Sequence, residues 1–259
     1  GKDYHSLQWL HYCYLQLGLF KKAESVFKTQ LKDMQEGIQS KSNLRAGKYY
    51  HRMLAASVIE TERWEWIESF PPPEGWKPKD FSKSGYHFIR GFSSAMQGKI
   101  NEAEKHLVIL HDLKKKGLRE NYFKRIQNLE VWELEIKTAI ALFQKDFATA
   151  IALSKKATAI EAKLPSPSGP PRILKPTYEL LGEVYLKAGK PLRAQKEFSI
   201  SLSRHSNRIR SLLGMARAAK LNGDKRIAMA NYRKVVKQLK NAKSELPELK
   251  EAKQFLNIN

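Results

Sequence analysis

Small, aromatic and glycine positions recur along this chain with a period of 34 residues. Gly189 and Gly223 stand 34 positions apart, and the residues around them match in register. The matching pairs are Gly182 and Ala216, Ala194 and Ala228, and Phe198 and Tyr232. Small residues let two helices approach closely, and large ones fill the space behind the contact. The pattern therefore predicts two consecutive hairpins of antiparallel helices, in which the glycine ends the first helix.

The same template fits three further segments less strictly. These segments are residues 10–27, 86–107 and 134–157. Elsewhere, apolar periodicity predicts a long helix over Leu44–Trp66, a short helix around Trp64–Phe70 and a last helix near Pro247–Leu256. Together these elements predict an all-α fold, a right-handed solenoid of antiparallel helix hairpins with about twelve helices.

Two proline-rich stretches interrupt the helical pattern, at residues 70–80 and 164–176. Both are predicted to be extended loops, because proline lacks an amide donor. Each has two interpretations, a hinge or a segment that fills a groove. We predict degenerate hairpins over 1–163, a connection over 164–176, and two well-formed hairpins with a capping helix over 177–259. We expect these parts to form one continuous array.

The formal net charge of +21 is concentrated toward the C-terminus. Residues 172–259 carry 20 Lys and Arg against 7 Asp and Glu, a net charge of +13. Such an excess attracts acidic proteins, nucleic acid or anionic lipid, although it is also typical of an ordinary solvated surface. No apolar run reaches the roughly 18–20 residues of a membrane span. We expect a soluble protein, cytoplasmic or exported, from which a targeting segment could have been removed.

Sequence motifs of catalysis are absent from the chain. It contains no glycine-rich phosphate loop, no nucleophile elbow and no zinc-protease motif. His106 and His111 are five residues apart on one predicted helix and so point in different directions, which disfavours a shared metal. Glu179 and Glu183 share a helix face, and we interpret them as a solvated acidic strip rather than a catalytic pair. We therefore predict no enzyme activity, no cofactor and no metal. Cys13, the single cysteine, excludes an internal disulfide.

The two hairpins of residues 177–259 resemble tetratricopeptide repeats. The chain as a whole resembles the C-terminal half of a larger family of tetratricopeptide-repeat proteins found mainly in bacteria. The segments that carry this likeness are residues 11–24, 87–107 and 168–232. The resemblance implies further repeats upstream of Gly1 and assigns no defined activity.

In arrays of this type the first helix of each hairpin lines a concave, partner-binding surface. The repeat register places the following candidates there: Gln8, Tyr12, Glu179, Glu183, Lys187, Arg210, Arg217 and Lys220. This mixed groove, basic at one end, suits a protein or peptide partner that carries some acidic residues. The main hypothesis is thus a non-catalytic scaffold. The alternative is a nucleic-acid-binding module that uses the basic second helix of the last hairpin, with Lys225, Arg226, Arg233, Lys234, Lys237 and Lys240. An enzyme or small-ligand domain with a site in the irregular stretch Trp64–Phe88 is a third and weaker hypothesis.

Overall fold

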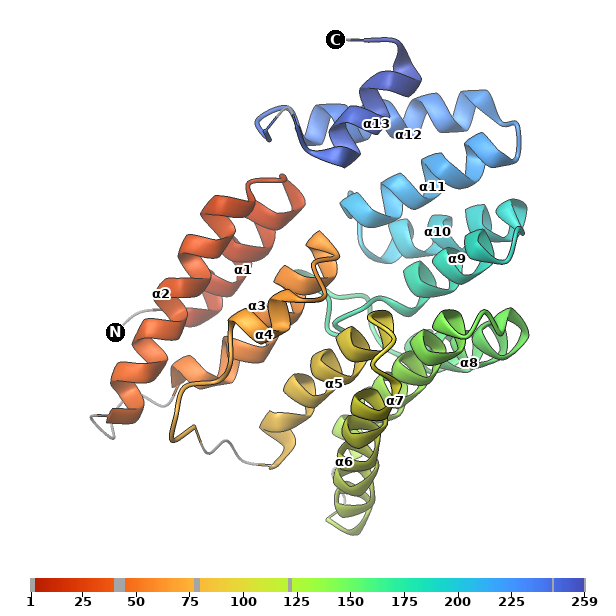
Figure 1. Ribbon diagram of the computed structural model, residues 1–259. Coiled ribbons are helices and arrows are strands. Elements are labelled where there is room, and N and C mark those ends of the chain that lie inside the picture. Colours follow the sequence, from red (N-terminus) through yellow and green to blue (C-terminus); the bar gives the residue numbers. More distant parts are fainter. Residues whose placement is uncertain (1–2, 40–44, 77–79, 121–122, 244, 259) are drawn as a thin grey trace. The chain divides into compact units, whose positions relative to one another are not determined.

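The computed structural model describes residues 3–39, 45–76, 80–120, 123–243 and 245–258, and within these ranges the chain forms thirteen helices and no strand (Figure 1). Within each part of the chain, most helices pack against the next helix in sequence, as in a solenoid-like helical repeat. The predicted all-α fold is thus confirmed, with one helix more than the approximate number expected. The chain divides into two compact units: Gly1–Leu15 with Phe20–Asp146 forms unit 1, and Gln16–Leu19 with Phe147–Asn259 forms unit 2.

Unit 1 holds the degenerate hairpins. Its helices are α1 (Tyr4–Gln16, whose last residue is assigned to unit 2), α2 (Phe20–Gln39), α3 (Arg45–Thr61), α4 (Trp66–Ser69), α5 (Asp80–Met96), α6 (Ile100–Arg119) and α7 (Phe123–Phe143). The predicted long helix stops at Thr61 because Glu62 takes the left-handed conformation, with φ of 53°. Trp76, from the first proline-rich loop, packs edge-on against Tyr50 and Tyr86, with ring centroids 5.4 and 5.7 Å apart. This part of the loop is therefore attached to the aromatic core of unit 1.

Unit 2 holds the two regular repeats. Its helices are α8 (Phe147–Glu161), α9 (Thr177–Lys187), α10 (Pro191–Arg204), α11 (Ile209–Leu221), α12 (Lys225–Gln238) and α13 (Pro247–Leu256). The division between the units precedes α8, so the proline-rich connection 164–176 lies inside unit 2. The end of this connection is packed, since Ile173, Leu174 and Lys175 are all buried.

Left-handed residues mark the turn of each hairpin. Gly18, Gly98, Gly189 and Gly223 all have φ between 67° and 80°. An L-residue with a side chain rarely adopts this conformation, whereas glycine adopts it freely. The α7–α8 turn uses Lys145 instead, with φ of 60°. The predicted role of glycine in ending the first helix of each hairpin is thus confirmed at Gly189 and Gly223.

The ring of Phe198, on α10, fills the space that two glycines leave open in unit 2. Phe198 is fully buried. A Cβ atom added at Gly182 on α9 would come within 2.8 Å of this ring, and one added at Gly214 on α11 would come within 2.3 Å. The ring therefore lies directly against the backbone of both helices. The repeat register predicts the small residue at position 182 but does not single out Gly214, which belongs to the next repeat.

Candidate partner-binding surface

Four charged side chains form a buried network at the contact between α9 and α11. Glu179, on α9, has no exposed surface. Its carboxylate accepts hydrogen bonds from Arg208 Nε at 2.7 Å, from Arg208 Nη2 at 2.9 Å and from Ser211 Oγ at 2.6 Å. Lys175 Nζ, just before α9, donates to Glu179 Oε1 at 3.0 Å and to Glu183 Oε1 at 2.6 Å. Two cations thus face two carboxylates, and the formal charges cancel.

The electrostatics of the network keep its central groups ionised. Burial alone would raise the pKa of the Glu179 carboxyl, but the positive charges of Arg208 and Lys175 outweigh burial and hold this pKa far below its usual range. Burial alone would likewise lower the pKa of Lys175, whereas the carboxylates of Glu179 and Glu183 raise it. Each partner therefore stabilises the charge of the other.

The predicted solvated acidic strip on α9 is wrong for Glu179. The side chain of Glu179 is fully buried, while that of Glu183 keeps 28% of its exposure. The reason is that both cations come from outside α9, Lys175 from the proline-rich connection and Arg208 from the residue before α11. Glu179 therefore cannot touch a partner directly, and its place at the contact of α9 with α11 makes it a positioning residue.

Carboxylates of α13 neutralise the arginines that were predicted to make one end of the groove basic. Arg210 Nη1 donates to Glu248 Oε1 at 3.2 Å. Arg217 makes a two-pronged contact with Glu251, with Nε donating at 2.9 Å and Nη2 at 2.6 Å. The Tyr232 hydroxyl on α12 also donates to Glu251, at 2.7 Å. These pairs cancel the expected positive charge of both arginines.

The remaining candidates differ in their access to solvent. Lys187 ends α9 and Lys220 is the residue before the end of α11, and both are exposed. The ammonium of Lys220 lies 5.6 Å from the centroid of the Phe255 ring, on α13. Next to it, Leu221 is 66% exposed. In unit 1 the candidate Gln8 is buried, and Tyr12 is half-buried.

Contacts from α8 and α10 fix the beginning of α9. The carboxylate of Glu161, the last residue of α8, accepts from the backbone N of Thr177 at 2.8 Å and from its hydroxyl at 2.6 Å. Arg204, on α10, donates to the backbone oxygen of Leu164 at 2.9 Å. These bonds hold both ends of the proline-rich connection. They therefore place Lys175 where it can reach the two carboxylates of α9.

Two histidines of unit 1, one on α5 and one on α6, form a pair that the sequence did not indicate. His87 Nδ1 lies 3.1 Å from His106 Nδ1, a hydrogen bond in which one ring donates to the other. His111, which the sequence placed on the same helix as His106, lies with Nδ1 3.5 Å from Glu133 Oε1 instead. Among the described side chains, no three histidine, cysteine or carboxylate groups gather closely enough to hold a metal ion.

Acidification is expected to destabilise unit 1. Burial lowers the pKa of His11 and of His51 to about 3, and that of His87 to about 4, from an ordinary value of 6.5. Between pH 6.5 and pH 4 the unfolded chain therefore binds more protons than the folded chain. Stability that is present above pH 6.5 is lost as the pH falls through this range. At pH 5 the loss is on the order of 2 kcal/mol each for His11 and His51.

Urea unfolding at pH 7 and at pH 5, followed by tryptophan fluorescence, measures this effect. All five tryptophans lie in unit 1, so their fluorescence reports on that unit. The variant His11→Gln is expected to reduce the difference between the two midpoints. The variant His111→Gln, at a half-exposed side chain, is the control and should leave the difference unchanged. A native chain with equal midpoints at both pH values would contradict the prediction.

In the part of the chain that the structure describes, no helix is both long and apolar enough to cross a membrane.

Comparisons with known proteins do not assign the chain to a family. No family model matches the sequence. No curated protein shows significant similarity to it either.

Proposed function

We propose that this chain is a tetratricopeptide-type array that binds a protein or peptide partner and performs no chemistry on it. The observation that carries the proposal is the pair of exposed lysines, Lys187 and Lys220, near the C-terminal ends of two helices that contact each other, α9 and α11. Leu221, the residue after Lys220, adds an exposed apolar side chain. A surface of cations and apolar groups on adjacent helices is suited to an extended peptide with carboxylate and aliphatic side chains.

The buried network at the starts of α9 and α11 supports binding by a rigid pair of helices. Glu179 joins the start of α9 to Arg208 and Ser211, which flank the start of α11. Side chains on two helices that are held in this way lose less freedom when a partner binds. The same contacts argue against a catalytic role for Glu179. A carboxylate with a strongly lowered pKa, surrounded by donors, is a poor proton acceptor for a substrate.

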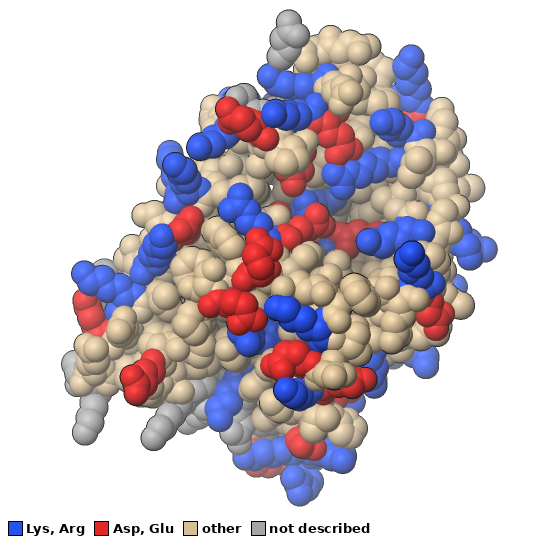
Figure 2. All heavy atoms as spheres, viewed as in Figure 1, with Lys and Arg blue, Asp and Glu red and all other residues tan. Residues whose placement is uncertain are grey.

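The charges of the surface also indicate the class of partner. Arg210 is already paired with Glu248, and Arg217 with Glu251. Both arginines therefore attract an acidic peptide less strongly than arginines without a carboxylate partner would. Lys and Arg are nevertheless scattered over the face seen in Figure 2, with Asp and Glu between them. We therefore propose a partner whose few carboxylates meet Lys187 and Lys220, rather than a highly acidic one.

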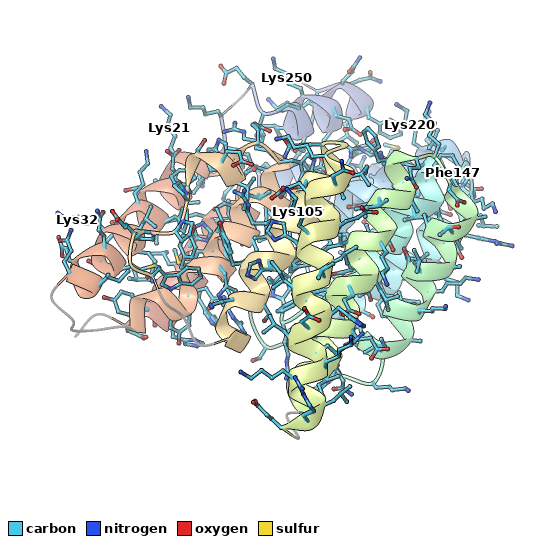
Figure 3. All side chains as sticks on the ribbon, turned by 60° about the horizontal axis from the view of Figure 1, so that its bottom comes forward. Lys21, Lys32, Lys105, Phe147, Lys220 and Lys250 are labelled. Carbon is cyan, nitrogen blue, oxygen red and sulfur yellow. The ribbon has the colours of Figure 1, made fainter. Side chains whose placement is uncertain are left out.

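The double variant Lys187→Glu/Lys220→Glu is expected to lose this partner. Peptides selected from a random displayed library on the native chain serve as the probe, and their Kd is measured by fluorescence anisotropy. Reversing two charges at the contact should weaken binding at least about tenfold, which corresponds to roughly 1.4 kcal/mol. The matched control is Lys28→Glu/Lys105→Glu, which reverses two exposed lysines in unit 1 (Lys105 in Figure 3).

A second arm of this experiment separates a direct contact from a loss of folding. Selected peptides in which the carboxylates are replaced by lysine should bind the double variant better than they bind the native chain. If the double variant and the control variant retain the same affinity, the partner does not contact Lys187 and Lys220. If the library yields no binder at all, the peptide-binding proposal itself fails.

A further inference from the structure

A line of cations without counter-charges runs along the outer face of α12. Arg226, Arg233 and Lys237 are all exposed. At 100° per residue they fall within about 40° of one another around the helix, over a length of about 16 Å. Lys234 on the same helix and Lys240 just beyond its end are exposed as well. In Figure 1, α12 lies behind α13.

No carboxylate of α12 balances these charges. The helix sequence KRIAMANYRKVVKQ contains neither Asp nor Glu. Asp224, at its N-cap, uses its side chain to accept a hydrogen bond from the backbone N of Ile227 at 2.9 Å. The carboxylates of the neighbouring α13 pair with Arg210 and Arg217 of α11. Within the described part of the chain, the cations of α12 take part in no salt bridge.

Three exposed lysines of unit 1 are arranged differently. On α2, Lys28 lies 2.6 Å from Glu24 and Lys32 lies 3.8 Å from Glu36. On α6, Lys105 lies 3.0 Å from Glu102. Figure 3 shows Lys32 at the outer edge of the molecule. These three solvated lysines therefore face carboxylates of their own helices, whereas the cations of α12 have no such neighbours.

The charges in the first turn of α12 oppose the stability of the helix, whereas Lys237 in the last turn is favourably placed for the helix dipole. Lys225 and Arg226 occupy the first turn, which holds no acidic residue, and their positive charges meet the positive end of the helix dipole there. Arg233 and Lys237 are like charges four residues apart, which repel each other on one face. A polyanion that binds along this face would relieve both effects. Local features that weaken a helix point to a functional surface.

We propose that the outer face of α12 binds the phosphate backbone of nucleic acid without reading its sequence. Arginine forms two-pronged hydrogen bonds with phosphate, and two of the three aligned cations are arginines. The exposed large apolar and aromatic residues in the described ranges lie outside α12, so this face offers no ring for base stacking and no side chain for insertion into a bilayer. The remaining contacts are those with the phosphate backbone of the nucleic acid, and such contacts are independent of base sequence and sensitive to salt.

The test is fluorescence anisotropy with labelled 20-base-pair DNA duplexes of two unrelated sequences, at NaCl concentrations from 25 to 200 mM. Both duplexes should bind with the same affinity. The slope of log K against log[NaCl] should approach roughly −2.7 if Arg226, Arg233 and Lys237 each contact one phosphate. The triple variant R226Q/R233Q/K237Q should lose this slope and bind at least about tenfold more weakly at 25 mM NaCl. The control K28Q/K32Q/K105Q removes the same charge from unit 1 and should keep both the slope and the affinity.

Thermal unfolding gives a second readout that does not depend on the label. Duplex DNA at 25 mM NaCl should raise the Tm of the native chain and of the control variant but not that of the triple variant. The variant Lys187→Glu/Lys220→Glu should keep its DNA affinity, which separates this surface from the peptide surface. The proposal is overturned if the native chain retains no duplex at 25 mM NaCl, or if the triple variant and the control variant weaken equally. It is also overturned if vesicles with 30% phosphatidylserine bind the native chain while duplex and single-stranded DNA do not.

Discussion

Replacing Glu179 by alanine is expected to lower the free energy of unfolding of unit 2 by about 3–5 kcal/mol, the usual effect of breaking a buried ion pair. The substitution leaves Lys175 and Arg208 buried, at 2% and 1% exposure, without the carboxylate that balances them. It also leaves the hydroxyl of Ser211 without the acceptor that lies at 2.6 Å. The variant Glu179→Gln, which keeps the shape of the side chain but not its charge, should lose a similar amount.

Urea unfolding followed by far-UV circular dichroism measures this loss, and tryptophan fluorescence on the same samples is an internal control. All five tryptophans lie in unit 1, whereas circular dichroism reports on the helices of both units. The urea midpoint from fluorescence should therefore change much less than the midpoint from circular dichroism. The variant Glu183→Ala is the matched comparison, since its side chain binds Lys175 but retains 28% exposure. Equal losses for Glu179→Ala and Glu183→Ala would show that the burial of Glu179 does not set the size of the effect.

Replacing Phe198 by alanine is expected to destabilise unit 2 by about 3–5 kcal/mol, because the cavity that remains lies between rigid helices. The ring is fully buried against Gly182 and Gly214. The variant Gly214→Ala attacks the same contact from the other side, since its new Cβ atom would lie 2.3 Å from the ring. Overpacking of this kind destabilises a core by about 1–3 kcal/mol.

A double-mutant cycle tests whether the two positions act through one contact. In Phe198→Ala/Gly214→Ala the new methyl group occupies part of the cavity, so the loss should be smaller than the sum of the two single losses. Urea midpoints from circular dichroism supply the four free energies. The variant Gly189→Ala is a useful control, because no atom lies within 4 Å of its added Cβ and only its backbone φ of 67° opposes the change. Additive losses at 198 and 214 would contradict the direct contact.

The parts of the fold that the sequence predicted are those with a local signal. The period of 34 residues placed the left-handed turns at Gly189 and Gly223, which the structure confirms. The predicted last helix coincides with α13, because Pro247 is suited to a first helical position. The helix predicted over residues 44–66 was too long. Glutamate is not a residue type that indicates the left-handed conformation that Glu62 adopts.

The parts that the sequence did not predict depend on contacts between distant residues. Arg208 stands 29 residues after Glu179, and Glu251 stands 34 residues after Arg217. A repeat register shows which side of a helix a residue occupies, but it does not show which charge from another element will meet it there. Only Lys175, four residues before Glu179, had a spacing that could have indicated its partner. The groove candidates lie on the first helices of their hairpins, while the burial of Glu179 and Arg210 was not predicted.

The position of Glu179 has a consequence for how unit 2 comes apart. Its carboxylate belongs to the first regular hairpin, whereas two of its donors, Arg208 and Ser211, belong to the second. In repeat arrays the strength of the junction between neighbours decides whether single repeats fray or melt as a block. If either hairpin opens, this charge loses part of its shell of donors, so an intermediate with one hairpin melted is strongly disfavoured. Together with the ring of Phe198, which packs against both hairpins, this one acidic side chain is therefore expected to join them into one cooperative element.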